Sequence, residues 1–181
     1  MNNLKITIAL IVAVMLQWTL RNVAEPFAYV DFPLIVVVYA ALQRDAIKAI
    51  FFGTVAGLAV DALSGGLLGA NAFTKTLLAF IVSELARRVY MDNLLLRIPV
   101  IAGACLLDDM IYYWLHRLFG QAPSGDVFVT VAYSLIGTTI AGTVVFIILD
   151  YFLSEKARSR KAEVFPKRRN SRRRNPIRLG K

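Results

Sequence analysis

The chain has 181 residues, carries a formal net charge of +9 and is 57% hydrophobic. A soluble domain is about 45–50% apolar, so this composition excludes an ordinary soluble protein and predicts one integral membrane domain. The single cysteine, Cys105, and the single histidine, His116, exclude a disulfide framework and argue against zinc and against Cys–His catalysis. We find no nucleotide-binding glycine motif and no metal-ligand spacing, so neither a metal nor another cofactor is expected.

Six apolar segments follow one another along the chain, and a membrane-spanning helix needs about 20 residues. The second segment is the shortest and has Pro33 near its start, so it could tilt little or insert only partly. The sequence therefore predicts an all-α bundle of six spans in residues 1–153. The predicted spans are residues 4–20, 30–42, 46–63, 67–85, 94–119 and 127–153.

Basic residues are distributed unequally between the two ends of these spans, and this asymmetry predicts the orientation. With six spans and a cytoplasmic N-terminus, only Arg21 and Arg117 lie outside. Five spans would break the alternation, so we expect both termini in the cytoplasm. The basic residues predicted to lie inside, apart from the C-terminal tail, are Lys5, Arg44, Lys48, Arg87, Arg88 and Arg97.

The composition changes abruptly after Leu153, where residues 154–181 are strongly basic and lack apolar periodicity. We expect a disordered, solvated cytoplasmic tail that attracts anionic lipid headgroups or a cytoplasmic partner. Its single aromatic residue, Phe165, gives little support for base stacking, so nucleic acid is not expected as a ligand. The residues predicted to make this contact are Lys167, Arg168, Arg169, Arg172, Arg173 and Arg174.

An acidic residue, Asp61, lies inside the third apolar segment. An ionised carboxylate at this depth costs at least about 2.5–3.5 kcal/mol on insertion scales, so such a residue usually faces protein or water and is a candidate site. Gly53, Gly57 and Asp61 recur every four residues and therefore line one helix face. A smooth face of this kind suits close packing against another helix or a ligand.

The last predicted span carries a second face of small residues. Packing within the bundle and docking of a partner's helix both explain such a face. The residues predicted to bind a partner are Gly53, Gly57, Asp61, Ser64, Gly65, Gly66, Gly69, Ser134, Thr138 and Ala141.

Three intramembrane charges lie at similar depth. A helical rise of 1.5 Å per residue places Asp61, Lys75 and Asp108 roughly 16–20 Å from the inner surface. Lys75 could pair with Asp61 or Asp108 as a structural ion pair, the acids could be protonated, or the set could act directly in function. Asp109 and His116 belong to a polar and aromatic stripe, which is typical of the membrane interface and is favoured over a catalytic or proton-relay set.

Two sequence patches make the chain resemble the MreD family of rod shape-determining proteins. One is Asp31-Phe32-Pro33-Leu34, which leads into an apolar segment. The more specific patch runs from Gly57 to Gly69, where a glycine, Asp61 and Ser64-Gly65 precede Leu68-Gly69. Asp108, the chain length and the six apolar segments also fit the family. The long basic tail departs from the family pattern, so its role stays open.

This resemblance implies a non-enzymatic protein of the bacterial cytoplasmic (inner) membrane. Members of the family belong to the elongation complex, which builds side-wall peptidoglycan in rod-shaped cells. They associate with the bitopic protein MreC, and through it with MreB filaments, the glycosyltransferase RodA and a class B penicillin-binding protein. The family fold looks like the six-helix substrate-binding subunits of energy-coupling-factor vitamin transporters.

Two other functions compete with a scaffold. A small-molecule-binding subunit of an energy-coupling-factor type transporter would use Asp61, Lys75 and Asp108 as ligand contacts near the membrane midplane. An intramembrane enzyme would need Asp108 and Asp109 as paired acids. Adjacent residues on a helix point about 100° apart, and no nucleophile–base pair accompanies them. The sequence therefore predicts a scaffold without enzymatic activity.

Overall fold

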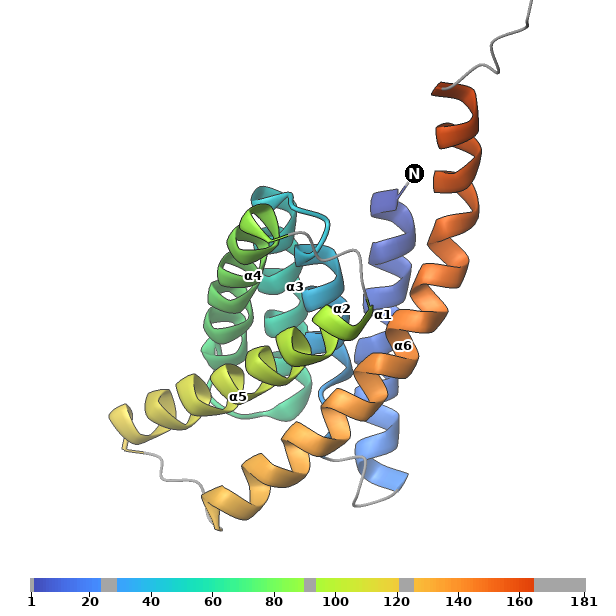
Figure 1. The fold of residues 1–181 in the computed structure, drawn as a ribbon. Coiled ribbons are helices and arrows are strands. Elements are labelled where there is room, and N and C mark those ends of the chain that lie inside the picture. The colour runs from blue at the N-terminus through green and yellow to red at the C-terminus, as the bar shows by residue number, and fades with distance from the viewer. Residues whose placement is uncertain (1, 24–28, 90–93, 121–125, 165–181) are drawn as a thin grey trace, which may run out of the picture.

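The computed structural model describes residues 2–23, 29–89, 94–120 and 126–164, and this part of the chain consists of helices joined by turns and loops, without a strand (Figure 1). The predicted all-α fold is therefore confirmed. The helices are α1 (Asn2–Val23), α2 (Phe32–Ala41), α3 (Ala46–Ser64), α4 (Ala70–Arg88), α5 (Leu94–Leu118) and α6 (Val127–Val164).

Successive helices from α1 to α4 run in alternating directions (Figure 1). The α2–α3 turn and the C-terminal ends of α4 and α6 lie toward the same side as the N-terminus of α1. Arg44 belongs to this turn and Arg87 and Arg88 to the last turn of α4, whereas Arg21 is in the last turn of α1 at the other side. The fold thus separates these basic residues as the charge rule predicts.

Four of the described helices are long and apolar enough to cross a membrane, namely α1, α3, α5 and α6. The chain is therefore a multi-pass membrane protein. Helix α4 has 19 residues, but buried polar side chains such as Asn71, Thr74 and Lys75 lower its hydropathy. These side chains face other helices, so α4 is polar on its protein-facing side.

Helix α2 is a short core helix. Its 10 residues rise only about 15 Å, half the thickness of the hydrocarbon layer, so α2 alone is too short for a full crossing, which fits the predicted alternative of partial insertion. All its residues from Pro33 to Ala41 are buried, because α1, α3, α4, α5 and α6 all contact it. A continuous run of apolar residues is equally typical of a span and of a helix enclosed by protein.

Helix α6 continues to Val164, past the predicted end of the span at Leu153. The segment after Leu153 is rich in alanine, lysine, glutamate and arginine, which favour a helix in water as well as in a membrane. The first part of the predicted tail is therefore helical rather than disordered. The six basic residues predicted to contact lipid or a partner lie outside the described residues.

Local signals fix the ends of α3 and α4. Asp45 caps α3 by accepting a hydrogen bond from the backbone N–H of Lys48 at 3.3 Å, and its carboxylate pairs with Nζ of Lys48 at 2.6 Å. These bonds from Lys48 lower the pKa of Asp45. Gly65 ends α3 with φ +64° and Gly69 precedes α4 with φ +96°, a left-handed conformation that glycine adopts without strain.

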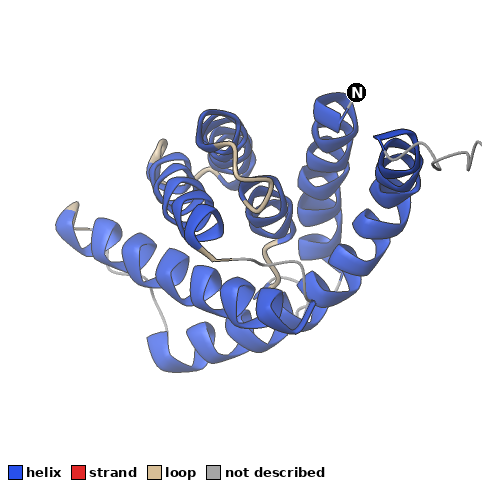
Figure 2. Ribbon diagram, turned by 45° about the horizontal axis from the view of Figure 1, so that its top comes forward, coloured by secondary structure: helices blue, strands red, loops and turns tan. Residues whose placement is uncertain are grey.

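Helices α5 and α6 lie across one side of the group formed by α2, α3 and α4 (Figure 2). The hydrophobic core lies around α2, where Ile35 and Val37 are fully buried and Phe146 of α6 packs edge-on against Tyr39 at 5.3 Å. The polar groups that enter this core gather at the N-terminal end of α2, which places the candidate site there.

Candidate functional site

Asp61 holds the turn between α3 and α4 together. It is 2% exposed, and its carboxylate accepts hydrogen bonds from the backbone N–H groups of Gly69 (2.9 Å), Asn71 (3.1 Å) and Ala72 (3.1 Å). The Asn71 side-chain amide donates a fourth bond at 2.8 Å. The first N–H groups of a helix have no partner inside it and favour a negative charge. Asp61 was predicted to contact a partner protein. In the structure its carboxylate instead bonds to the start of α4 in the same chain.

We expect Asp61→Ala to lower the free energy of unfolding by about 2–4 kcal/mol, because charge-assisted bonds at a buried helix N-terminus are lost. The thermal midpoint in mild detergent, followed by size-exclusion chromatography, measures this loss. Asp45→Ala is the matched control, since it removes an N-cap carboxylate at the surface. A loss for Asp61→Ala no larger than that for Asp45→Ala would contradict the structural role of Asp61.

Gly53 and Gly57 face α4 of the same chain. A Cβ atom on Gly57 would lie 2.3 Å from Cα of Ala72, and one on Gly53 would lie 2.7 Å from the carbonyl oxygen of Lys75. The backbones of α3 and α4 therefore touch along this face. The prediction of close helix packing is confirmed, but the prediction that a partner's helix occupies this face is wrong, because α4 already covers it.

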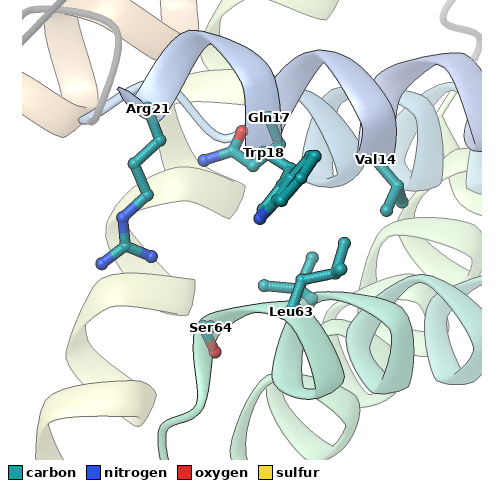
Figure 3. A pocket seen from close by; sticks show the side chains of 7 residues that line it. Val14, Gln17, Trp18, Arg21, Leu63 and Ser64 are labelled. Atoms are coloured by element: carbon teal, nitrogen blue, oxygen red, sulfur yellow. The ribbon is translucent and has the colours of Figure 1, made fainter. Parts of the chain in front are cut away.

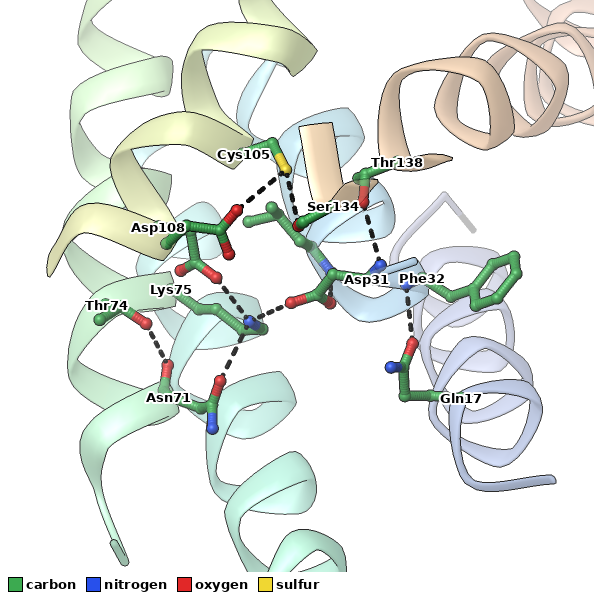
Figure 4. Close-up of polar contacts among 12 residues, drawn as sticks. Gln17, Asp31, Phe32, Asn71, Thr74, Lys75, Cys105, Asp108, Ser134 and Thr138 are labelled. Atoms are coloured by element: carbon green, nitrogen blue, oxygen red, sulfur yellow. Dashed lines mark hydrogen bonds and ion pairs between the residues drawn. The ribbon is translucent and has the colours of Figure 1, made fainter. Parts of the chain in front are cut away.

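Lys75 is the centre of a buried ion cluster (Figure 4). Its side chain is fully buried, and its Nζ donates to Oδ2 of Asp31 at 2.6 Å, to Oδ2 of Asp108 at 3.1 Å and to Oδ1 of Asn71 at 3.4 Å. An ammonium group has three donors, and all three have an acceptor here. The predicted structural pairing of Lys75 with Asp108 is confirmed, whereas no ion pair joins Lys75 to Asp61.

Sequence reasoning did not place Asp31 in this cluster. Its Oδ1 caps α2 by accepting from the N–H of Leu34 at 2.9 Å, while its own N–H donates to Oγ1 of Thr138 at 3.1 Å. The adjacent N–H of Phe32 donates to Oε1 of Gln17 at 3.0 Å. An aspartate two residues before Pro33 is typical of a helix start, and that signal indicates a cap inside the predicted span.

The second small-residue face also points into the bundle. Ser134 and Thr138 are buried, with Oγ of Ser134 3.4 Å from Sγ of Cys105. Ala141 packs against the hydrophobic core. Of the two predicted alternatives, packing within the bundle accounts for these residues. His116 is buried as well, and its ring lies 4.1 Å from that of Tyr112.

A polar cavity of about 190 Å³ lies beside the ion cluster, near the C-terminal ends of α1 and α3. Asp108 lines it and is 5% exposed, yet its Oδ1 has no hydrogen-bond partner among the described residues. Asp109 also lines it, and its carboxylate accepts from the Cys105 thiol at 3.9 Å and interacts with the Ser134 hydroxyl. The described residues contain no group of three side chains arranged to hold a metal ion.

Two further hollows lie nearby. The first, of about 230 Å³, separates α1 from α3 and is lined by Trp18, Arg21, Leu63 and Ser64 among others (Figure 3). The second is an apolar groove of about 690 Å³ between α5 and the start of α6. Its lining includes Met110, Trp114, Phe128, Val131, Ala132 and Leu135.

Comparison with known families gives one match. The model of the family described as rod shape-determining protein MreD matches residues 2–155, which include the whole of α1 to α5 and most of α6. Neither a curated protein nor a solved structure matches the chain. The predicted likeness to vitamin-transporter subunits therefore stays a prediction.

Proposed function

Because the chain belongs to the MreD family of rod shape-determining proteins, we propose that it is a non-enzymatic scaffold of the bacterial cell-elongation complex. The family match over residues 2–155 carries this proposal, since membership implies a role in rod shape determination. In this proposal the protein lies in the cytoplasmic membrane with both termini in the cytoplasm. It binds MreC, and through MreC it helps organise MreB, RodA and a class B penicillin-binding protein.

The intramembrane charges support a structural function. Asp61 fixes the turn between α3 and α4, and Lys75 joins α2, α4 and α5 through Asp31 and Asp108. The Lys75 contacts tie three helices together, and removing Lys75 would leave two buried carboxylates without a compensating charge. Helices tied together in this way suit a scaffold that holds another membrane helix in one orientation.

The apolar groove between α5 and α6 is where we place the single membrane helix of MreC. Its walls are open and apolar: Phe128 is 88% exposed and Trp114 is 67% exposed. Large neighbouring apolar side chains that the chain itself leaves uncovered are typical of a surface for another membrane helix or for lipid. Ala132, a small exposed residue, lines the same groove and leaves room for close approach.

We expect Ala132→Trp to reduce recovery of a co-expressed MreC-type partner by about tenfold, which corresponds to roughly 1.4 kcal/mol of binding free energy. The bulky ring fills the groove without touching the buried core. Affinity purification of the tagged protein in mild detergent, with quantitative mass spectrometry, measures the recovery.

Ile140→Trp is the control, because Ile140 is an exposed position of α6 that does not line the groove. Equal recovery with Ala132→Trp and with the unmodified protein would show that MreC does not bind in this groove. Failure of the unmodified protein to recover any MreC-type partner would overturn the scaffold proposal itself.

A further inference from the structure

Gly103 is a glycine inside α5 that the packing of the described residues does not require. A Cβ atom built on Gly103 has no neighbour within 4 Å, and its backbone has no positive φ. Each of the other glycines inside a described helix is needed for close packing, because a Cβ atom there would lie 3.0 Å or less from a neighbour. These glycines are Gly53, Gly57, Gly137 and Gly142. Glycine is a poorer helix former than alanine, so Gly103 weakens α5 without a benefit inside the bundle.

The open position at Gly103 lies in the middle of an exposed apolar face of α5. Leu96, Leu107 and Met110 are 45%, 40% and 49% exposed, and each lies one or two helical turns from Gly103 on the same face. Ile101 on the opposite face is buried. Interfaces between membrane helices are rich in glycine, because it lets two backbones approach closely. This face of α5 therefore has the form of a helix-packing surface that no described helix covers.

The apolar groove between α5 and α6 is shorter than the path of a membrane helix. Along α5 it extends from Leu106 to Trp114, a rise of about 12 Å, whereas the hydrocarbon layer is about 30 Å thick. Before Leu106 the two helices close on each other, since Sγ of Cys105 lies 3.4 Å from Oγ of Ser134. A spanning helix that occupies the groove must therefore continue outside it, and the face around Gly103 continues the groove along α5.

The charge of the groove indicates the chemistry of its occupant. Two acids and no basic residue line it. The carboxylate of Asp109 already interacts with the Cys105 thiol and the Ser134 hydroxyl. Asp126, directly before α6, is exposed, and no ion pair joins it to a basic side chain in the described part of the chain. A basic side chain at this end of a partner's helix would complement Asp126 and set the orientation of that helix.

We propose that a partner's single membrane helix follows α5 across the membrane, with its backbone against Gly103, half of its length in the groove and a basic side chain beside Asp126. From Leu96 to Trp114 the exposed face of α5 rises about 27 Å, which is close to a full crossing. This inference rests on the proposed function, which places the helix of an MreC-type protein in the groove. It adds the path of that helix, its point of closest contact and the charge at its end.

Recovery of a co-expressed MreC-type protein with the tagged full-length chain in mild detergent tests the contact at Gly103. We expect Gly103→Leu to lower this recovery about tenfold, because the new side chain would separate two backbones that are in contact. Gly103→Ala should lower it less. Both variants should keep the thermal midpoint of the unmodified protein or raise it, since the new side chain has open space around its Cβ atom.

Ala62→Leu is the matched control, because Ala62 is a small exposed residue of α3 that lines none of the cavities described above. Equal loss of recovery with Ala62→Leu and Gly103→Leu would overturn the inference. If Ala132→Trp lowered recovery and Gly103→Leu did not, the partner would occupy the groove without following this face, and the inference alone would fail. If the unmodified protein recovered no partner, the proposed function would fail with it.

A charge exchange tests the contact at Asp126. Asp126→Lys should lower recovery about threefold, as expected when an exposed ion pair is replaced by repulsion. Each basic residue that flanks the membrane helix of the partner is then replaced with glutamate, one at a time. One of these changes should restore recovery with Asp126→Lys while lowering recovery with the unmodified chain. If none of them restores it, no basic side chain of the partner lies beside Asp126.

Discussion

Replacing Lys75 with methionine is expected to lower the free energy of unfolding by about 3–5 kcal/mol, because removing one partner of a buried ion pair leaves uncompensated charge. Methionine fills a similar volume, so the loss of stability would result from the missing positive charge and not from a cavity. Asp31 and Asp108 would then share a buried site without the ammonium that now lies 2.6 Å and 3.1 Å from them. Since native proteins have about 5–15 kcal/mol of stability in total, little folded protein should remain. The yield of monodisperse protein in mild detergent and its thermal midpoint measure the effect.

Two further variants identify the cause of this loss. Adding Asp31→Asn and Asp108→Asn to Lys75→Met removes every charge of the cluster and should recover a large part of the stability. Lys48→Met is the surface control, since Lys48 pairs with Asp45 where both side chains are substantially exposed. Normal stability of Lys75→Met would show that the cluster contributes nothing to the fold.

Gly57→Ala should also be strongly destabilising, although it adds a single methyl group. The new Cβ atom would meet Cα of Ala72 at 2.3 Å and the backbone N of Ala72 at 2.4 Å. Backbone atoms cannot rotate away, so α3 and α4 must separate. Overpacking a close-packed interior costs about 1–3 kcal/mol or more, and we expect the upper end here. Chemical denaturation in detergent, followed by tryptophan fluorescence, measures the change.

Gly103→Ala is the matched control for Gly57→Ala. A Cβ atom on Gly103 has no neighbour within 4 Å, and Gly103 lies inside α5. The added methyl group should leave stability unchanged or raise it by about 0.5–1 kcal/mol, because alanine favours a helix over glycine. Similar behaviour of the two variants would show that α3 and α4 are not in backbone contact.

The sequence alone predicts α1, α3, α5 and the start of α6 to within a few residues. Long apolar segments bounded by polar or glycine-containing turns identify membrane helices well, because each helix must be long enough to cross the lipid. Helix α2 has the same apolar character for another reason, since other helices enclose it. Its enclosure depends on tertiary structure, so hydropathy alone cannot distinguish it from a span.

The sequence identifies some residues of the candidate site but not their partners. Asp61, Lys75 and Asp108 stand out because charges in apolar segments need partners. The partners of Asp61 are backbone N–H groups at the start of α4, and any residue type supplies those. Asp31 was missed because a full span over residues 30–42 would place it near the outer surface, whereas in the fold it lies beside Lys75. The enclosure of α2 by other helices, which hydropathy does not show, thus brings this acid into the cluster.

The shortness of α2 has a consequence for how the chain is assembled during synthesis. Asp31 and α2 leave the ribosome before Lys75, which neutralises Asp31, and before Thr138, which accepts a hydrogen bond from the backbone N–H of Asp31. A helix of 10 residues is too short to cross the hydrocarbon layer, so it is not a stable membrane span by itself. The insertion machinery must therefore hold this segment, or leave it at the surface, until the later helices enclose it. A nascent chain that stops before α6 would lack Thr138 and leave the backbone N–H of Asp31 without this acceptor, which is costly inside a membrane.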